Sequence, residues 1–214
     1  SPDAPLNADA HEAAWGHTLF DTALGPCGIA WGPGGIAAVQ LPEADAPATQ
    51  ARLLRGLRQG TYPQVLLPAA PPAVVRHAIA GIQGLLAGQA LDLREVPLDM
   101  SGVSAFHQQV YAIARAIPPG QTRTYGEVAE QLGSKGLSRA VGQALGLNPF
   151  APIVPCHRVL AANGKPGGFS GGSGRPGPLG DSPARPRTLD SSETSLMRWA
   201  SPPDSVGLGW PRVR

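Results

Sequence analysis

Three adjacent residues of this 214-residue chain could carry out nucleophilic chemistry: Cys156, His157 and Arg158. A cysteine reacts as its thiolate, and positive charge nearby lowers the pKa of a thiol. His157 and Arg158 therefore predict a lowered pKa and a reactive nucleophile at Cys156. The alternative is that Cys156 is a small buried apolar residue, as most free cysteines are. The tripeptide by itself leaves both interpretations open.

Prolines crowd the approach to this cysteine. Pro149, Pro152 and Pro155 all come shortly before it. Because proline fixes φ and has no backbone N–H, these positions exclude a helix interior and a central strand. The segment before the cysteine is therefore expected to be a stiff loop, and other elements must position it.

Two short helices are predicted before this loop. Thr124, followed three residues later by Glu127, forms a capping box, so a helix begins at this point. A turn at residues 134–136 separates it from a second helix over residues 137–147. This order is typical of a DNA-binding helix-turn-helix, but an ordinary corner between two helices has the same pattern.

The second of these helices carries small side chains. Ala140, Gly142 and Ala144 follow Arg139 within it. A glycine inside a helix costs about 1 kcal/mol relative to alanine. Small residues permit the close approach of a backbone or a narrow groove, and Arg139 would project from them as one long cation.

The rest of the chain divides into an α/β unit and a helical unit. Ser104 can cap a helix that places Phe106, Val110, Ile113 and Ile117 on one face. Before it, short apolar runs between glycines and prolines predict antiparallel strands. The expected strands are residues 18–21, 27–31, 36–41 and 91–98, and the expected helices are residues 47–59 and 71–87. We place the two units at residues 14–100 and 101–173, after a disordered leader at residues 1–13.

Composition and charge limit the class of protein. Gly (28) and Pro (24) make up about a quarter of the chain, yet 42% of its residues are hydrophobic. Apolar stretches end well before the roughly 18 residues of a membrane span. Two cysteines favour a reduced, cytoplasmic compartment over a disulfide scaffold, and residues 1–13 lack the features of a signal peptide.

Charge is distributed unevenly between the two units. Residues 1–100 hold five arginines against nine acidic residues, a net charge of −4. Residues 101–173 hold six basic residues against two acidic ones, a net charge of +4. This asymmetry suggests a polyanionic partner for the second unit alone.

One extended motif joins these features. Asn148-Pro149, five further residues and then Pro155-Cys156-His157-Arg158-Val159 resemble the O6-alkylguanine-DNA alkyltransferase family. The glycine-rich run at residues 167–172 and the preceding helix-turn-helix fit the same family. The resemblance covers residues 106–172. It implies an RNase H-like α/β N-terminal domain and a mainly α, winged-helix-like C-terminal domain with a helix-turn-helix.

The resemblance implies a role for each residue of the motif. Cys156 would accept an alkyl group from O6 of guanine, and His157 would draw the thiol proton through a water molecule. Asn148 would organise the turn around the site. Tyr125 would press on the target's 3′ phosphate and help to protonate the leaving guanine.

Further residues would bind DNA or line the base pocket. Arg139 would enter the duplex as a finger, and Ala140 and Gly142 would lie in the minor groove. Val159, Phe169 and Ser170 would contact the flipped base. The implied partner is double-stranded DNA containing O6-alkylguanine. We expect a cytoplasmic monomer that uses no cofactor and does not contact a membrane, and no metal site, because Cys27 is the one cysteine of the first unit.

The chain departs from the family pattern in residues 174–214. A helix ending in a glutamate that orients the histidine is expected there, but the segment is rich in Gly, Pro and Arg. Either it has diverged, with Glu193 as the replacing acid, or the reading frame changes near residue 173. Without that acid His157 would be a weaker base, so alkyl transfer would be slow while DNA binding is partly retained. A non-catalytic lesion-binding protein is the corresponding alternative function.

Overall fold

A three-stranded antiparallel sheet opens the part of the chain that the computed structural model describes, residues 15–58 and 67–162. Its strands are β1 (Gly16–Thr22), β2 (Gly25–Gly32) and β3 (Gly35–Gln40), in the order β1-β2-β3. Gly25 and Gly35 begin β2 and β3 with φ near +118° and +115°, which favours glycine in these tight connections. The first three predicted strands are therefore confirmed.

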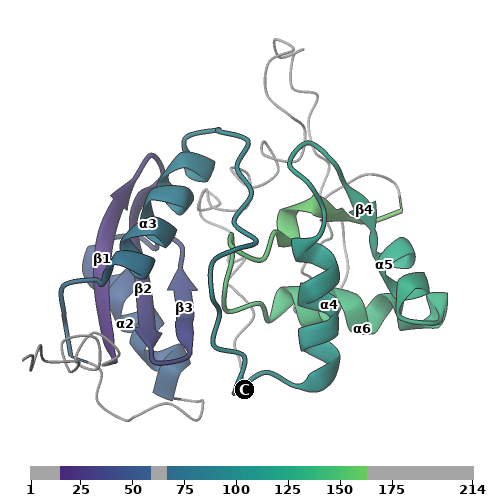
Figure 1. Cartoon of the computed structure of the whole chain (residues 1–214), viewed down its shortest axis with the longest axis horizontal. Coiled ribbons are helices and arrows are strands. Elements are labelled where there is room, and N and C mark those ends of the chain that lie inside the picture. Colours follow the sequence, from purple (N-terminus) through teal and green to yellow (C-terminus); the bar gives the residue numbers. More distant parts are fainter. Residues whose placement is uncertain (1–14, 59–66, 163–214) are drawn as a thin grey trace, which may run out of the picture.

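Two helices cover opposite faces of this sheet, as Figure 1 shows for α2 (Ala46–Arg58) and α3 (Ala73–Leu86). Ile29 and Trp31 of β2 pack into one buried cluster with Ile82 of α3. Ala30, between them, faces Leu53 of α2 in a second cluster. The alternation along β2 thus separates two cores, and both predicted helices are confirmed within two residues of their ends.

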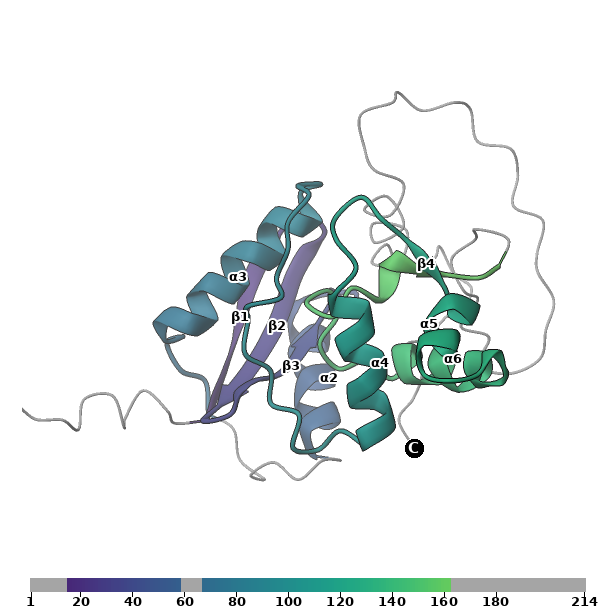
Figure 2. The ribbon, with the colours of Figure 1, turned by 45° about the vertical axis from the view of Figure 1, so that its right-hand side comes forward.

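The segment of residues 87–104 runs between the sheet and the second unit in both views (Figures 1 and 2). The strand predicted for residues 91–98 is wrong, because only an isolated bridge between Ile36 and Leu98 forms there. Leu93 and Val96 are buried as the apolar pattern requires. Backbone carbonyls in this segment accept hydrogen bonds from the side chain of Arg115 instead of from a neighbouring strand.

Helices dominate the second unit. They are α4 (Ala105–Arg115), α5 (Tyr125–Gln131), the short 3-10 helix η1 (Lys135–Leu137) and α6 (Ser138–Gly146). The Ser104 hydroxyl accepts from the His107 N–H, and the Thr124 and Glu127 side chains form the predicted capping box. The residues expected in a turn at 134–136 begin η1, whose N-terminus is capped by Ser134.

The buried face of α4 differs from the predicted one. Val110, Tyr111 and Ala114 are fully buried, whereas Phe106 and Ile113 are only partly buried. Tyr111 is part of the buried face, although the apolar pattern did not predict its burial. A buried tyrosine needs a partner for its hydroxyl, so this position is more than core filling.

A two-residue parallel pair closes the second unit. β4 (Arg123–Thr124) pairs with β5 (Val159–Leu160), which follows the 3-10 helix η2 (Cys156–Arg158). The two units are also joined directly, since the Val39 N–H donates to the Pro149 carbonyl over 2.8 Å. Among the described residues, no helix is long and apolar enough to cross a membrane.

Candidate active site

Cys156 begins η2 and is almost entirely buried, with 6% of its surface exposed. The pairing of β4 with β5 brings this turn beside the N-terminus of α5. Tyr125, the first residue of α5, is partly buried and packs against the buried cluster that contains Cys156 and Val159. Residues separated by about thirty positions in the sequence thus meet around one thiol.

Asn148 holds the loop before the cysteine at two points. Its Oδ1 accepts from the Phe150 N–H over 2.9 Å, and its Nδ2 donates to the Val154 carbonyl over 3.0 Å. The Cys156 N–H donates to that same carbonyl over 2.8 Å. Asn148 is buried, so its two bonds brace the loop without competition from water.

The expected low pKa of Cys156 is wrong for this structure. Burial raises the pKa of the Cys156 thiol to about 11, although hydrogen bonds from the Asn148 side chain and from nearby backbone groups lower it. At neutral pH only about one molecule in ten thousand would hold the thiolate at such a pKa. The thiol is therefore stored in its neutral form and needs a base to react.

The position of Arg158 explains why it does not activate its neighbour. Its guanidinium donates to the Ile117 carbonyl over 3.3 Å and to the Leu91 carbonyl over 3.1 Å. The charge is thus directed to the junction between the two units. Arg158 is close to Cys156 in the sequence, but in η2 its side chain extends to the Ile117 and Leu91 carbonyls.

His157 and Tyr125 are the remaining groups expected to move protons. His157 lies within η2 directly after Cys156 and is 3% exposed. Burial, and to a smaller extent the charge of an ionised Cys156, raises the pKa of Tyr125 to about 12. The Tyr125 phenol therefore stays protonated at neutral pH and can donate a hydrogen bond.

Of the residues predicted to contact DNA, Tyr125 begins α5 and the other three lie on α6. Arg139 is exposed, and Ala140 and Gly142 are partly exposed. Among the described residues, a Cβ added to Gly142 would meet no atom within 4 Å outside the neighbouring backbone of its own helix. Packing in the described part of the chain therefore does not require a glycine there, despite its cost of about 1 kcal/mol in a helix.

The predicted pocket residues are only partly within the described chain. Val159 is buried at the start of β5, directly after the reactive turn. Phe169 and Ser170 lie outside the described residues, as do residues 1–13 and the tail of residues 174–214.

Two side chains that form long-range hydrogen bonds were not identified from the sequence. Arg115 donates through Nη2 to the Leu93, Arg94 and Val96 carbonyls over 2.7 to 2.9 Å. Tyr111 donates from its hydroxyl to the Ala144 carbonyl of α6 over 2.7 Å. Both residues place a polar group on or beside the apolar face of α4, which is the one sign of them in the sequence. Their hydrogen-bond acceptors are distant in the sequence, so the sequence does not identify these partners.

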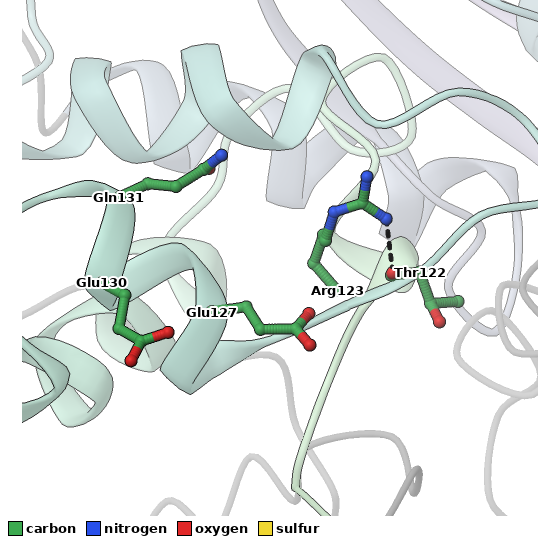
Figure 3. Close-up of a pocket in the computed structure, with 5 residues that line it drawn as sticks. All are labelled: Thr122, Arg123, Glu127, Glu130 and Gln131. Carbon is green, nitrogen blue, oxygen red and sulfur yellow. Dashed lines mark hydrogen bonds between the residues drawn. The ribbon is translucent and has the colours of Figure 1, made fainter.

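A hollow of about 500 Å³ lies beside α5, and Cys156 is not among the residues that line it (Figure 3). It is lined by Thr122, Arg123, Glu127, Glu130 and Gln131. Glu127 already caps α5 through the Thr124 N–H, and Glu130 pairs with Lys135 at 3.3 Å. These carboxylates have structural partners, so the hollow does not define a reactive site.

Metal chemistry has no cluster to support it in the ranges 15–58 and 67–162. No three side chains of the His, Cys, Asp and Glu types gather closely enough there to hold an ion. The candidate reactive groups of the described site are one buried thiol, a neighbouring imidazole and a phenol.

Comparison with known proteins places this arrangement in a class. Residues 105–179 match the family model for the DNA-binding domain of 6-O-methylguanine DNA methyltransferase. The methylated-DNA–protein-cysteine methyltransferase of Mycobacterium bovis is 42% identical over 122 residues, which are 57% of this chain and 73% of the relative. The fold and the cysteine motif thus define a protein of the DNA alkyltransferase class.

Two further proteins show the range of this class. The structure of Mycobacterium tuberculosis OGT in complex with DNA has a TM-score of 0.55 and 33% identity, covering 72% of this chain and 83% of that one. A DNA base-flipping protein of Thermus thermophilus is 37% identical over 56% of this chain and 80% of its own length. This chain belongs to the methylated-DNA–protein-cysteine methyltransferase family.

Proposed function

We propose that this protein repairs alkylated DNA by moving a methyl or larger alkyl group from O6 of guanine to the sulfur of Cys156. The observation that carries the proposal is the burial of Cys156 in a braced turn, in one cluster with residues of α5 and α6, within a member of this family. We propose O4-alkylthymine as a second substrate of the same site, because its alkyl–oxygen bond has the same chemistry.

The transfer is a direct displacement. The Sγ electron pair forms a bond to the alkyl carbon, and the bond from that carbon to guanine O6 breaks. Its electron pair remains on the guanine, which takes up one proton. The product is an S-alkylcysteine, so each protein molecule acts once.

This chain's own residues would manage the two protons. His157 takes the thiol proton through a water molecule, which overcomes the high pKa of the buried Cys156. Tyr125, protonated because burial raises its pKa to about 12, donates toward the leaving guanine. Asn148 fixes the turn so that the sulfur does not move during the attack.

The DNA would dock on α5, η1 and α6 acting as a helix-turn-helix. Gly142 leaves an open surface against which a minor groove could close, and the exposed Arg139 would fill the stack after the base is flipped out. A reacting O6 atom inside the duplex cannot reach a buried thiol, so extrusion of the nucleotide is required. The partner is then duplex DNA containing O6-alkylguanine.

The sheet unit would support this site as an RNase H-like domain. Its contact with the Pro149 carbonyl and the burial of Ile153 against its core tie it to the loop that holds Cys156. We propose that the protein acts as a monomer in the cytoplasm, since one chain carries both the DNA surface and the nucleophile.

A single-turnover assay tests the proposed function. The intact chain is incubated with a duplex that carries one isotope-labelled O6-methylguanine, and the peptide containing Cys156 is examined by mass spectrometry. We expect label on Cys156 with one methyl group per molecule. The Cys156→Ser variant is the matched control and should bind the duplex without gaining the label.

A lesion-binding protein without transfer is the second candidate function. The relative from Thermus thermophilus is named for base flipping, and residues 163–214, where an acid that orients His157 is expected, lie outside the described residues. Specific binding of the O6-methylguanine duplex with no label on Cys156 would select this function over transfer.

A further inference from the structure

Tyr111 is a buried tyrosine at the centre of the second unit that has no part in the proton transfers described above. It lies in α4, is 1% exposed, and donates from its hydroxyl to the Ala144 carbonyl over 2.7 Å. Ala144 is in the last turn of α6, where helix carbonyls run out of internal partners. The Asn148 N–H, which would reach that carbonyl in a longer helix, donates to Leu145 instead. Tyr111 therefore fixes the end of α6.

The ring of the same tyrosine reaches the loop before the cysteine. It meets the Phe150 ring edge to face, with centroids 6.3 Å apart and an angle of 88° between the planes. The Phe150 N–H donates to Asn148, and Asn148 donates to the Val154 carbonyl that also holds the Cys156 N–H. Each link in this series is buried, so a shift at one end is transmitted through packed atoms.

We propose that Tyr111 is a positioning residue that holds the end of α6 and the Cys156 turn in one fixed geometry. This inference rests on the proposed function, in which DNA docks on α6. The Tyr111 hydroxyl binds the end of α6, and its ring packs against the loop before Cys156. The position of a duplex docked on α6 is therefore fixed relative to the Cys156 sulfur. The distance between the docked base and Cys156 is then set by one side chain.

The ionisation of Tyr111 fits this role. Burial, with a smaller contribution from the charge of an ionised Cys156, raises the pKa of Tyr111. The hydroxyl therefore remains a donor to the Ala144 carbonyl throughout the neutral range, and also while the thiolate forms nearby.

Amide hydrogen exchange in the DNA-free chain gives the first test. Tyr111→Phe keeps the ring and removes only the hydroxyl. We expect the Cys156 amide to exchange about five to ten times faster, in line with loss of roughly one buried hydrogen bond from the series. Ser138→Ala is the matched control, because it removes a hydrogen bond to the Lys135 carbonyl at the other end of α6. It should leave the Cys156 amide unchanged.

The inference is overturned if the faster exchange in Tyr111→Phe stays within α4 and the last turn of α6. It is also overturned if Ser138→Ala speeds the Cys156 amide equally, since both changes would then act by loosening the helix. This measurement requires no alkyl transfer, so it stands even if the proposed function fails.

Transfer kinetics give the second test. With an O6-methylguanine duplex we expect Tyr111→Phe to slow the maximal single-turnover rate about tenfold, with duplex affinity within twofold of the parent. With the free base O6-methylguanine, which does not dock on α6, the rate should change less than twofold. Equal losses with both substrates would show a general defect of the site and reject the positioning role. An inactive parent chain would instead reject the proposed transfer and leave the exchange result to decide the role of Tyr111.

Discussion

Asn148 and Cys156 share one acceptor: the Asn148 side chain and the Cys156 backbone N–H both donate to the Val154 carbonyl, over 3.0 and 2.8 Å. The shared oxygen fixes η2 at its first residue, which is Cys156 itself. A proline-rich loop has few backbone N–H groups that can form hydrogen bonds. The two hydrogen bonds of the Asn148 side chain therefore contribute much of what holds this loop in place.

Removing that side chain should loosen the turn. Asn148→Ala leaves the buried Phe150 N–H without its acceptor, and we expect the free energy of unfolding to fall by about 1–3 kcal/mol. Urea denaturation measures the loss. Asn148→Asp keeps the acceptor but loses the Nδ2 donor to Val154, so its separate value shows which of the two bonds matters more. An alanine variant as stable as the parent would contradict the bracing role.

The pKa of the Cys156 thiol, raised by burial to about 11, predicts a steep pH dependence of its reactivity in the absence of DNA. Because the thiolate fraction increases tenfold per pH unit below the pKa, alkylation by iodoacetamide should speed up about tenfold per unit from pH 7 to pH 9. Mass spectrometry of the Cys156 peptide follows the rate. A rate that levels off near pH 8 would contradict the high pKa.

The same group links stability to alkaline pH. The pKa of Cys156 is higher in the fold than its ordinary value of 9.0, so the folded chain binds more protons than the unfolded chain above pH 9. The free energy of unfolding should therefore be steady below pH 9 and fall as the pH rises toward 11. Cys156→Ala should weaken this fall, and Cys27→Ala should weaken it too, since burial raises the pKa of Cys27 to about 12.

Gly142 offers a test that separates stability from DNA binding. Gly142→Ala adds a Cβ to open space within α6, so the free energy of unfolding should rise by about 0.5–1 kcal/mol while duplex affinity falls. Gly56→Ala in α2 is the control, because its Cβ also meets nothing within 4 Å. It should stabilise the chain similarly and leave affinity intact. Unchanged affinity in Gly142→Ala would remove α6 from the interface.

Arg115 should contribute more to stability than an exposed arginine. It donates to three carbonyls of the segment between the two units, and loss of such charged hydrogen bonds costs about 1.5–3 kcal/mol. Arg115→Gln is therefore expected to lower the free energy of unfolding by that amount in urea. Arg76→Gln, which removes an exposed arginine that among the described residues donates to the Pro71 carbonyl, should change it by less than about 0.5 kcal/mol. Similar losses in both variants would contradict the assignment.

Local rules predicted much of the secondary structure from the sequence. The capping box of Thr124 and Glu127 marks the start of α5, and glycines at the turns mark the ends of the first strands. These signals depend on neighbours a few residues apart, so they need no knowledge of the fold. The strand expected at residues 91–98 failed because Arg115, about twenty residues away, takes the carbonyls of that segment.

By itself the sequence determined that a cysteine lies in a rigid, proline-rich setting, and which family pattern surrounds it. The tertiary structure alone decided the state of that cysteine. Adjacent charge predicted an activated thiol, yet burial keeps Cys156 neutral and the Arg158 guanidinium binds carbonyls at the domain junction. The reason is physical: residue types and order set the available chemistry and the local turns, whereas desolvation and the direction of a side chain depend on everything packed around them.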